Sequence, residues 1–533
     1  MMVHARSSLR SLTLCLSLAV GASALTGCRV NEDDVHRWER TELGPTKLAA
    51  VVTHDKYPAK LRIEAAMSLI RMKPRGGKRV GIEKLFDALR DLPPEERKKL
   101  VGGLVPLLVA EMSKPPLPQQ GMAADEQKAV DPSIPFKDAA FGMLIYDKAP
   151  LVTEDEHKKV LRDALLAWIQ ADFSRRVAIS SQLYGVEQIV RYYKEEGAKI
   201  LPPLINEDSA YDRIARLIAD LATPETKALA SQRLVDLAKQ VESQAWFDKK
   251  KPVVKAANDA ANYKATEAQL NGQVGNFQEE QTLKVYGAMN KVKGRPAVNY
   301  LLAAAADPKR RPKVRQAALA ALEGGLDRSS NDDATAIVRI AAAEDTPDEA
   351  RDLAFARVGE LPRDVVAAKL TDLFAQKDEK HWKIRWVAAS TLLKMSTAKD
   401  VPDFFANLTK HLPPNAAGFA MGEPLEYGRL LGAMKPPVTR DQMVTELKNP
   451  SLPVKLTAIG YFFQYGKAAD VSVLDAVKDD KTALPKVADD PAAKWQCAVP
   501  KQGGKPGETE MKDATNVGEF VKACVEPRMQ ANK

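Results

Sequence analysis

The sequence is poor in aromatic residues and in cysteine. Phe, Tyr and Trp make up 6% of its 533 residues, and 4 residues are Cys. Strands are enriched in aromatic and β-branched residues, whereas this chain repeats Ala-rich stretches such as 301–306 and 317–322. Hydrophobic residues account for 45% and charged residues for 28% of the chain, which is ordinary globular composition. We therefore expect an all-α protein.

Motifs for catalysis and metal binding are also missing. The 6 histidines lie far apart, and the chain has no His-Glu-x-x-His motif, no phosphate-binding Gly-x-x-x-x-Gly-Lys-Ser/Thr loop and no Gly-x-Ser-x-Gly elbow. The acidic clusters at 154–156 and 332–333 fall where helices are expected to begin, and there they complement the helix dipole. The sequence thus predicts no enzymatic activity, no cofactor and no metal site.

The charge balance excludes a strongly basic protein. The formal net charge is +9, and the clusters 249–251 and 309–311 are short. Nucleic-acid binding needs a larger basic stripe, so we expect no nucleic-acid partner. The remaining interpretations of this basic excess are a solvated surface or attraction to anionic envelope polymers or lipid headgroups.

Long apolar runs are confined to the N-terminus. Arg6 and Arg10 precede the run 12–25, which is shorter than the ~20 residues of a spanning helix and matches a signal peptide. The run ends in Leu-Thr-Gly-Cys at 25–28, which resembles the lipobox of bacterial lipoproteins and implies lipidation of Cys28, including palmitate. Arg29, in place of a retaining Asp, favours the outer membrane facing the periplasm. The alternative is ordinary secretion with a coincidental cysteine.

Two cysteines remain for the exported body. Cys15 leaves with the signal, so Cys497 and Cys524 form an even pair near the C-terminus. In an oxidising compartment we predict a disulfide between them, worth about 3 kcal/mol for a loop of this length. The alternative is a pair of free, buried thiols.

A helical pattern repeats along the chain. In the segment 311–322, Pro312 suits the first turn of a helix, and small and apolar residues follow at helical spacing behind Arg315. Arg351 and Arg385 repeat that position 36 and 34 residues further on, and Lys455 follows after 70 residues. A copy surrounds Arg62, and weaker copies surround Lys137, Arg176, Arg213 and Lys255. Amphipathic segments between these helix starts, such as 160–169 and 232–241, give each unit two helices.

The Pro-x-Val-Arg-x-x-Ala-x-x-Ala-Leu pattern at 312–322 resembles the HEAT repeat, including the short HEAT-like repeats of phycobilin lyase relatives. The resemblance is good at 312–322 and 384–393 and faint over 130–290. It implies an α-solenoid of ten to twelve helical hairpins over most of 35–480. It also implies a structural role for Arg62, Arg315, Arg351 and Arg385, each paired with an acid of the neighbouring unit.

The expected domains are a signal peptide at 1–27, the HEAT-like α-solenoid at 28–480 and an irregular extension at 481–533 with one short helix near 516–525. Prolines predict a long loop insertion at about 113–135 and a second interruption at 413–424, and glycines predict a third at 271–275.

Stacked hairpins leave an extended surface that is usually used for binding. We expect a membrane-tethered scaffold for other envelope proteins, of undetermined oligomeric state. The alternatives are a binder of an anionic cell-wall polymer or glycan, and an enzyme on a HEAT-like scaffold. Trp382, Lys383 and Trp386 share one stretch of a predicted helix, where the two indoles either pack against the preceding helix or, if exposed, anchor a partner.

Overall fold

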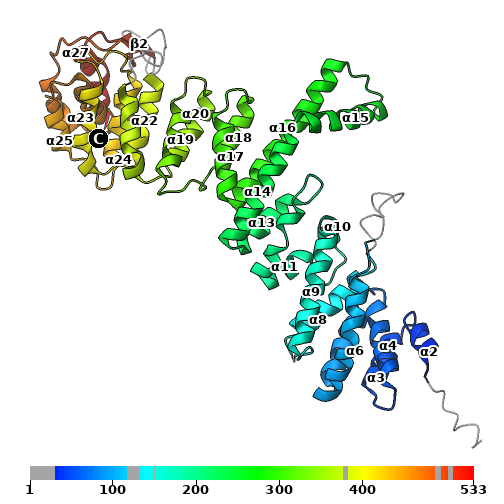
Figure 1. The fold of residues 1–533 in the computed structure, drawn as a ribbon. Coiled ribbons are helices and arrows are strands. Elements are labelled where there is room, and N and C mark those ends of the chain that lie inside the picture. The colour runs from blue at the N-terminus through cyan, green and yellow to red at the C-terminus, as the bar shows by residue number, and fades with distance from the viewer. Residues whose placement is uncertain are drawn as a thin grey trace, which may run out of the picture. The chain divides into compact units, whose positions relative to one another are not determined.

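The computed structural model describes residues 30–116, 131–148, 150–375, 382–486, 494–501 and 508–532, and it is helical almost throughout (Figure 1). The chain divides into two compact units, residues 1–226 and 227–533. Each unit is an α-solenoid in which helical hairpins follow one another in chain order, as the HEAT-like pattern predicts. Cys28 and the signal peptide lie outside the described residues.

The first unit begins with short helices around a small core. Its helices are α2 (Glu32–Trp38), α3 (Gly44–Thr53), α4 (Ala59–Arg71), α5 (Val80–Asp91), α6 (Pro94–Met112), α8 (Ile134–Ile145), α9 (Asp155–Ala171), α10 (Phe173–Ala178), α11 (Val186–Tyr193), α12 (Glu195–Lys199) and α13 (Tyr211–Leu221). Helix α4 packs against α6, and α6 packs against α8, while α3 packs against α5. Alternate helices therefore form two layers.

The second unit continues the same arrangement. Its helices are α14 (Pro224–Val241), which begins just before the unit boundary, α15 (Gln244–Ala260), α16 (Glu267–Val292), α17 (Arg295–Ala306), α18 (Pro312–Ala321), α19 (Asn331–Ala342), α20 (Asp348–Val358), α21 (Arg363–Asp372), α22 (Trp382–Lys394), α23 (Val401–His411), α24 (Gly422–Ala433), α25 (Arg440–Glu446) and α26 (Leu452–Tyr465). Helices α16, α18, α20, α22, α24 and α26 pack in series. Arg315, Arg351 and Arg385 lie on α18, α20 and α22, and Lys455 lies two units later on α26. The repeat spacing is thus confirmed.

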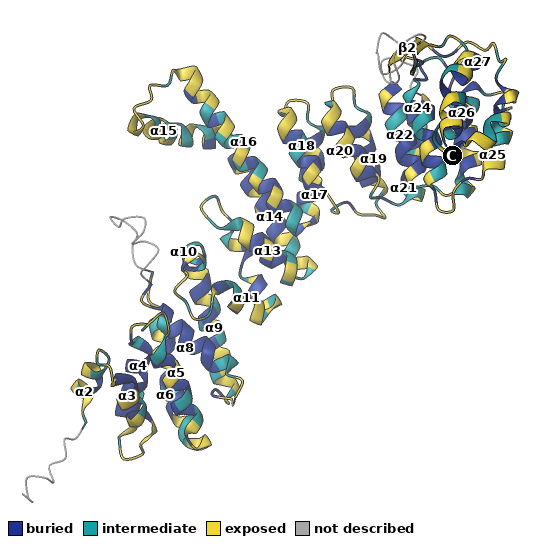
Figure 2. Cartoon of the chain, turned by 180° about the vertical axis from the view of Figure 1, so that it is seen from behind, coloured by how far each residue is buried: buried dark blue, intermediate teal, exposed yellow. Residues whose placement is uncertain are grey.

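Apolar and small residues line the faces between these helices. On α18, Val314, Ala318 and Leu319 are buried, and on α22 Ala388, Ala389 and Leu392 are buried. Figure 2 shows buried residues between the packed helices and exposed residues on their outer sides. Proline stands in the first turn of α17, α18, α23 and α26, where its missing N–H costs no hydrogen bond.

Of the three predicted interruptions of the helical pattern, one is confirmed, one is wrong and one lies mostly outside the described residues. The one at 413–424 is confirmed, because residues 412–421 are not helical and α24 begins at Gly422. The one at 271–275 is wrong, because Gly272 and Gly275 lie within α16. A glycine costs a helix only about 1 kcal/mol, and the Thr266 capping box with Gln269 together with buried Leu270 and Val274 supports this helix. Most of the loop predicted at 113–135 lies outside the described residues, and α8 begins at Ile134.

The C-terminal extension is more regular than expected. Strand β1 (Gln496–Pro500) pairs antiparallel with β2 (Thr509–Asp513), and α27 (Val517–Phe520), the π-helical segment η7 (Val521–Val525) and α28 (Glu526–Ala531) follow. The strands escaped prediction because β2 is exposed along its whole length and has no apolar alternation. The expected short helix near 516–525 exists, but helical structure continues to Ala531.

This extension covers the end of the helical stack. Helix α28 packs on α26 and on the 3-10 segment η5 (Ala468–Ala476). The Ala468 N–H donates to the carbonyl of Asn532 at 3.1 Å, and the Asn532 side-chain amide donates to the carbonyl of Gly466 at 3.1 Å. A solenoid needs a cap at its terminal repeat, and the described residues 494–501 and 508–532 provide one.

Candidate functional site

The basic position that recurs in the repeat pattern is filled by buried arginines in the strong copies. The side chains of Arg62, Arg315 and Arg351 each donate to the carbonyl of the residue 10 positions earlier, which belongs to the preceding helix. Arg62 also reaches Glu96 at 2.7 Å, and Arg315 reaches Asp345 at 2.9 Å. Acids of the following unit therefore accept from these two guanidinium groups, as predicted.

Of the other two predicted arginines, Arg385 pairs with an acid of the neighbouring unit and Arg351 bonds backbone carbonyls. Arg385 is almost fully buried and forms a two-pronged contact with Glu423, at 2.6 Å and 3.0 Å, while it also donates to the carbonyl of Gly418. Arg351 donates to the carbonyls of Ala341 and Thr346 at 2.8 Å and 2.9 Å. Arg62, Arg315 and Arg385 therefore join neighbouring units and belong to the scaffold, not to a ligand site. Arg351 bonds carbonyls of its own hairpin instead, so the predicted pairing with an acid of the neighbouring unit is not found for it among the described residues.

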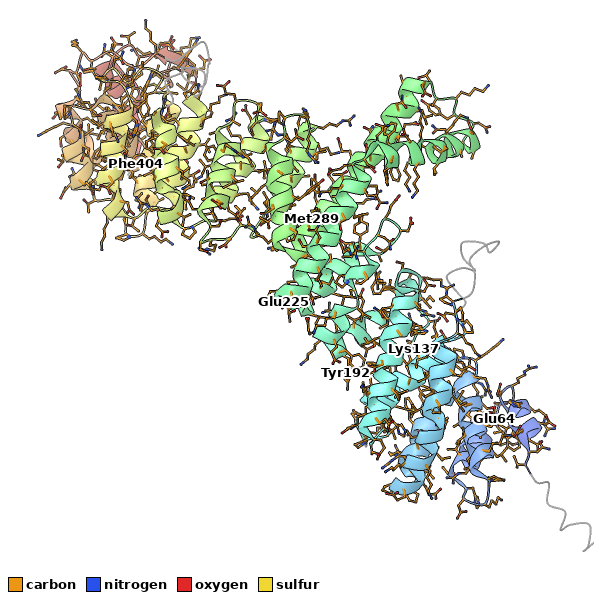
Figure 3. The ribbon with its side chains drawn as sticks, viewed as in Figure 1. Glu64, Lys137, Tyr192, Glu225, Met289 and Phe404 are labelled. Atoms are coloured by element: carbon orange, nitrogen blue, oxygen red, sulfur yellow. A yellow bond between two sulfur atoms is a disulfide. The ribbon has the colours of Figure 1, made fainter. Side chains whose placement is uncertain are left out.

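A second buried polar cluster lies in the first unit. Lys137 on α8, labelled in Figure 3, pairs with Asp138 at 2.6 Å and donates to the carbonyl of Tyr184. Arg176 pairs with Asp131 at 2.7 Å and lies over the Trp168 ring. Burial lowers the pKa of Lys137, and the Asp138 carboxylate opposes that shift. The weak repeat copies at Lys137 and Arg176 thus fill buried positions like those of the strong copies.

The tryptophan pair packs chiefly inside the fold. Trp382 is 3% exposed and lies against Ala420, and its ring stacks on Trp386 at 5.4 Å with an angle of 15°. Trp386 is partly buried, and its ring fills the space beside Gly422. Lys383 holds its ammonium 5.8 Å from the Trp382 ring. This geometry favours the packing interpretation, because Trp382 offers a partner no accessible surface.

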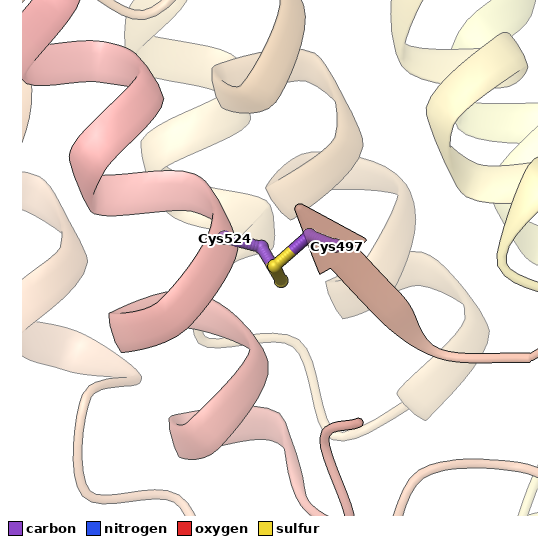
Figure 4. Close-up of a disulfide and its surroundings, with 2 residues drawn as sticks. All are labelled: Cys497 and Cys524. Atoms are coloured by element: carbon purple, nitrogen blue, oxygen red, sulfur yellow. A yellow bond between two sulfur atoms is a disulfide. The ribbon is translucent and has the colours of Figure 1, made fainter. Parts of the chain in front are cut away.

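The predicted disulfide is present. Cys497 on β1 and Cys524 on η7 are bonded, with Cα atoms 5.7 Å apart (Figure 4). The bond ties the two-stranded sheet to the helical segment whose Val521 and Val525 side chains are buried. It therefore holds the cap together.

One hairpin of the second unit departs from the stack. Helix α15 and the first half of α16, residues 244–280, extend away from α17 and α18 in Figure 1, and we call them the arm. Trp246 is the one buried residue of α15. It lies 5.4 Å from the Phe277 ring of α16, and Asn258 bonds Gln273 at 2.7 Å. The arm is held together by a few contacts and exposes most of α15.

A cleft of about 640 Å³ lies at the base of the arm. Its walls come from the corner between α14 and α15, from α16, and from the connection between α17 and α18 at residues 307–311. Gln278 secures the corner by donating to the carbonyls of Val241 and Ser243 at 2.7 Å and 3.1 Å. We call this site the arm cleft.

A polar network forms the floor of the arm cleft. The Glu242 carboxylate accepts from the hydroxyls of Tyr286 and Tyr300 at 2.8 Å and 2.5 Å and pairs with Arg310 at 2.9 Å. Arg310 also donates to the Tyr286 hydroxyl at 2.8 Å. Four side chains from α14's end, α16, α17 and the 307–311 connection thus meet at one point.

Electrostatics fix the protonation of this network. Burial and the Glu242 charge raise the pKa of Tyr286, and burial and the hydrogen bond to Glu242 raise the pKa of Tyr300 to about 12. Burial disfavours the charged form of Arg310, but the hydrogen bonds to Glu242 and Tyr300 and the Glu242 charge together outweigh it and raise the pKa of that guanidinium. Both phenols therefore stay protonated as donors, and neither serves as a base.

The rim of the cleft carries further charges. Arg311 and Lys313 both pair with Glu279 at 3.3 Å, and Lys309 is exposed beside them. The basic cluster 309–311 is therefore largely neutralised. The sequence revealed the basic cluster but not Glu242, Tyr286 and Tyr300. Glu242 and Tyr300 are 58 positions apart, and none of the three residues follows the phase of the repeat.

The described residues contain neither a cluster of metal-binding side chains nor a helix suited to cross a membrane. Within them, no group of three or more His, Cys, Asp or Glu side chains is placed to hold a metal ion. No described helix has the length and apolar character needed to cross a membrane.

These features define an all-α, HEAT-like solenoid with one projecting arm. No protein-family model matches the sequence, and no curated protein matches it. Among solved structures, the chain is similar to a mutant form of Kap121p, at 12% sequence identity and a TM-score of 0.26, over 88% of this chain and 47% of that one. This chain spans about half the length of that structure.

Proposed function

We propose that this chain is a lipid-anchored scaffold of the bacterial cell envelope that docks other envelope proteins, with the arm cleft as its principal binding site. The observation that carries the proposal is the departure of the arm from the stack. A hairpin that projects from a solenoid buries less of its own surface, so it leaves a helix and a concave base accessible to a partner.

The anchoring part rests on the sequence and on one structural feature. The Leu-Thr-Gly-Cys motif at 25–28 supports lipidation of Cys28, and Arg29 supports outer-membrane sorting. The Cys497–Cys524 disulfide is consistent with an oxidising compartment such as the periplasm.

Binding is favoured over catalysis by the chemistry of the cleft. Its carboxylate and guanidinium groups satisfy one another, and its phenols have raised pKa values. A binder of anionic polymers is less well supported, because Arg310, Arg311 and Lys251 are paired with Glu242, Glu279 and Glu267. Protein docking suits such a mixed polar surface, since a non-obligate interface is about as polar as the rest of a protein surface.

Site-specific photocrosslinking in intact cells tests the docking site. A photoreactive amino acid at Gln244, which lines the cleft, should yield an adduct with one or a few envelope proteins. The matched control is the same amino acid at exposed Lys284 of α16, outside the cleft lining. Lys309→Glu should reduce the Gln244 adduct. Identical adducts from both positions, or none from Gln244, would refute the docking site.

Anchoring is tested separately. Cys28→Ala should abolish incorporation of labelled palmitate and release the protein from membranes, whereas Cys15→Ala, within the predicted signal peptide, should change neither. Membrane association of Cys28→Ala at the wild-type level would contradict the anchor.

A further inference from the structure

A groove with a volume of about 770 Å³ lies in the second unit, away from the arm. It runs between the last turn of α23, the connection at 412–417 and the turn that precedes α26. Its size falls within the range of ligand sites. Four of the ten lining residues are prolines: Pro413, Pro414, Pro450 and Pro453.

The groove has an unusual balance of chemical groups. Proline supplies apolar surface but no backbone N–H, so four of its wall positions cannot donate a hydrogen bond. Donors come instead from the side chains of Lys410, His411 and Ser451. No Asp or Glu occurs among the ten lining residues. An apolar ligand that carries a carboxylate therefore complements these walls, since Lys410 brings a positive charge and His411 and Ser451 bring donors.

The wall at 412–417 is held in place by the repeat scaffold. Gly418 adopts a φ of +78°, which favours glycine, and its carbonyl accepts from the buried Arg385. Ala416 is fully buried, and its N–H donates to the Pro413 carbonyl at 2.7 Å. The groove is thus preformed, which lowers the entropy lost on binding.

Access to the groove is open. Pro413, Pro414 and Pro450 are exposed, while Pro453 is buried at its floor. A chain can therefore enter from the surface and lay its side chains against the proline rings. A compact small molecule would leave these exposed rings uncovered, so the geometry favours a segment of polypeptide.

We infer that this groove binds an extended acidic segment of a partner protein, in which a carboxylate is flanked by apolar residues. The inference rests on the proposed scaffold function and adds a second docking site with defined chemistry. The carboxylate lies against Lys410 and His411, and the apolar residues pack on the prolines.

Selection from a displayed random-peptide library on the purified full-length chain tests this inference. Enriched peptides should contain Asp or Glu beside Leu, Val or Pro, and a fluorescent peptide of repeated Pro-Leu-Glu should bind at least tenfold more tightly than its Pro-Leu-Gln counterpart. Enrichment of peptides without acidic residues, or equal binding of the two probes, would overturn it.

Three variants locate the binding. Lys410→Glu combined with His411→Glu should weaken the Pro-Leu-Glu probe at least tenfold, and Ala417→Trp should block the groove. Lys394→Glu, at an exposed position of α22 outside the lining, should leave the affinity unchanged. Retained binding by Ala417→Trp would refute the site, provided that thermal melting shows each variant folded.

The two proposals fail independently. Loss of the Gln244 crosslink with intact peptide selection would reject the arm cleft alone. Crosslinking at Gln244 without acidic peptide selection would reject the proline-lined groove alone.

Discussion

The stack from α17 to α26 and the neighbouring arm differ in how far the cation at the repeat position is buried. In the stack, the cations at the repeat position are buried, as Arg315 and Arg385 are. In the arm, Lys255 occupies the corresponding sequence position, but its side chain is 65% exposed and pairs with Asp259 one turn away on the same helix. In this second unit, the buried cations Arg315 and Arg385 therefore lie on helices that the next unit covers, whereas the exposed Lys255 lies on a helix that has left the stack.

The largest expected effect comes from removing a buried cation. Arg385→Ala leaves the Glu423 carboxylate buried without its guanidinium partner, and it frees the carbonyl of Gly418. We expect a loss of about 3–5 kcal/mol in the unfolding free energy of the second unit. Lys255→Ala should change it by less than about 0.5 kcal/mol. Urea unfolding followed by circular dichroism measures both, and equal effects would remove the distinction between stack and arm.

Removing the disulfide of the C-terminal cap should cost nearly as much stability as removing Arg385. Cys497→Ser with Cys524→Ser removes a crosslink across 27 residues, and we expect a loss of about 3 kcal/mol in the stability of the extension. Limited proteolysis should then cleave the extension before it cleaves α17–α20. Unchanged proteolysis under reducing conditions would show that packing of α28 on α26 suffices.

The ion pair between Asp480 and Lys455, the repeat-position cation of α26, should make the stability of the stack depend on pH. Burial would raise the pKa of Asp480, but hydrogen bonds from Lys455 and Thr482 outweigh burial and lower it to about 2. A lowered native pKa stabilises the fold above the unfolded pKa, and this contribution is lost as pH falls from about 4 towards 2. We expect at most about 2 kcal/mol.

Thermal melting between pH 6 and pH 2 checks this expectation. Asp480→Asn should flatten the acid limb, and the exposed Asp479→Asn should not. A wild-type acid limb in Asp480→Asn would contradict the assignment.

The smallest effect is expected in the network below the arm. Tyr286→Phe removes one hydroxyl that donates to Glu242 but leaves Tyr300 and Arg310 in place. We expect about 1 kcal/mol of lost stability and faster amide hydrogen exchange at the base of the arm than in α18–α20. Uniform exchange across both regions would show that the arm is as tightly held as the stack.

The sequence predicted what depends on short-range pattern. Arg315 with the alanines that follow it indicated a helix and a repeat phase, because both follow from helical spacing. The ion pair of Arg315 with an acid of the next unit was implied by the resemblance to the HEAT repeat. The arm cleft could not be predicted, since Glu242, Tyr286 and Arg310 meet only because α16 packs beside the end of α14 and the 307–311 connection. The interruption expected at 271–275 failed because tertiary packing of Leu270 and Val274 outweighs the cost of two glycines. Cys28 lies outside the described residues, so its lipidation stays a prediction.

The extension shields part of α26 from solvent, because α28 packs against this helix and against η5. Truncation that removes α28 would therefore uncover apolar surface on α26, and exposed apolar patches favour self-association.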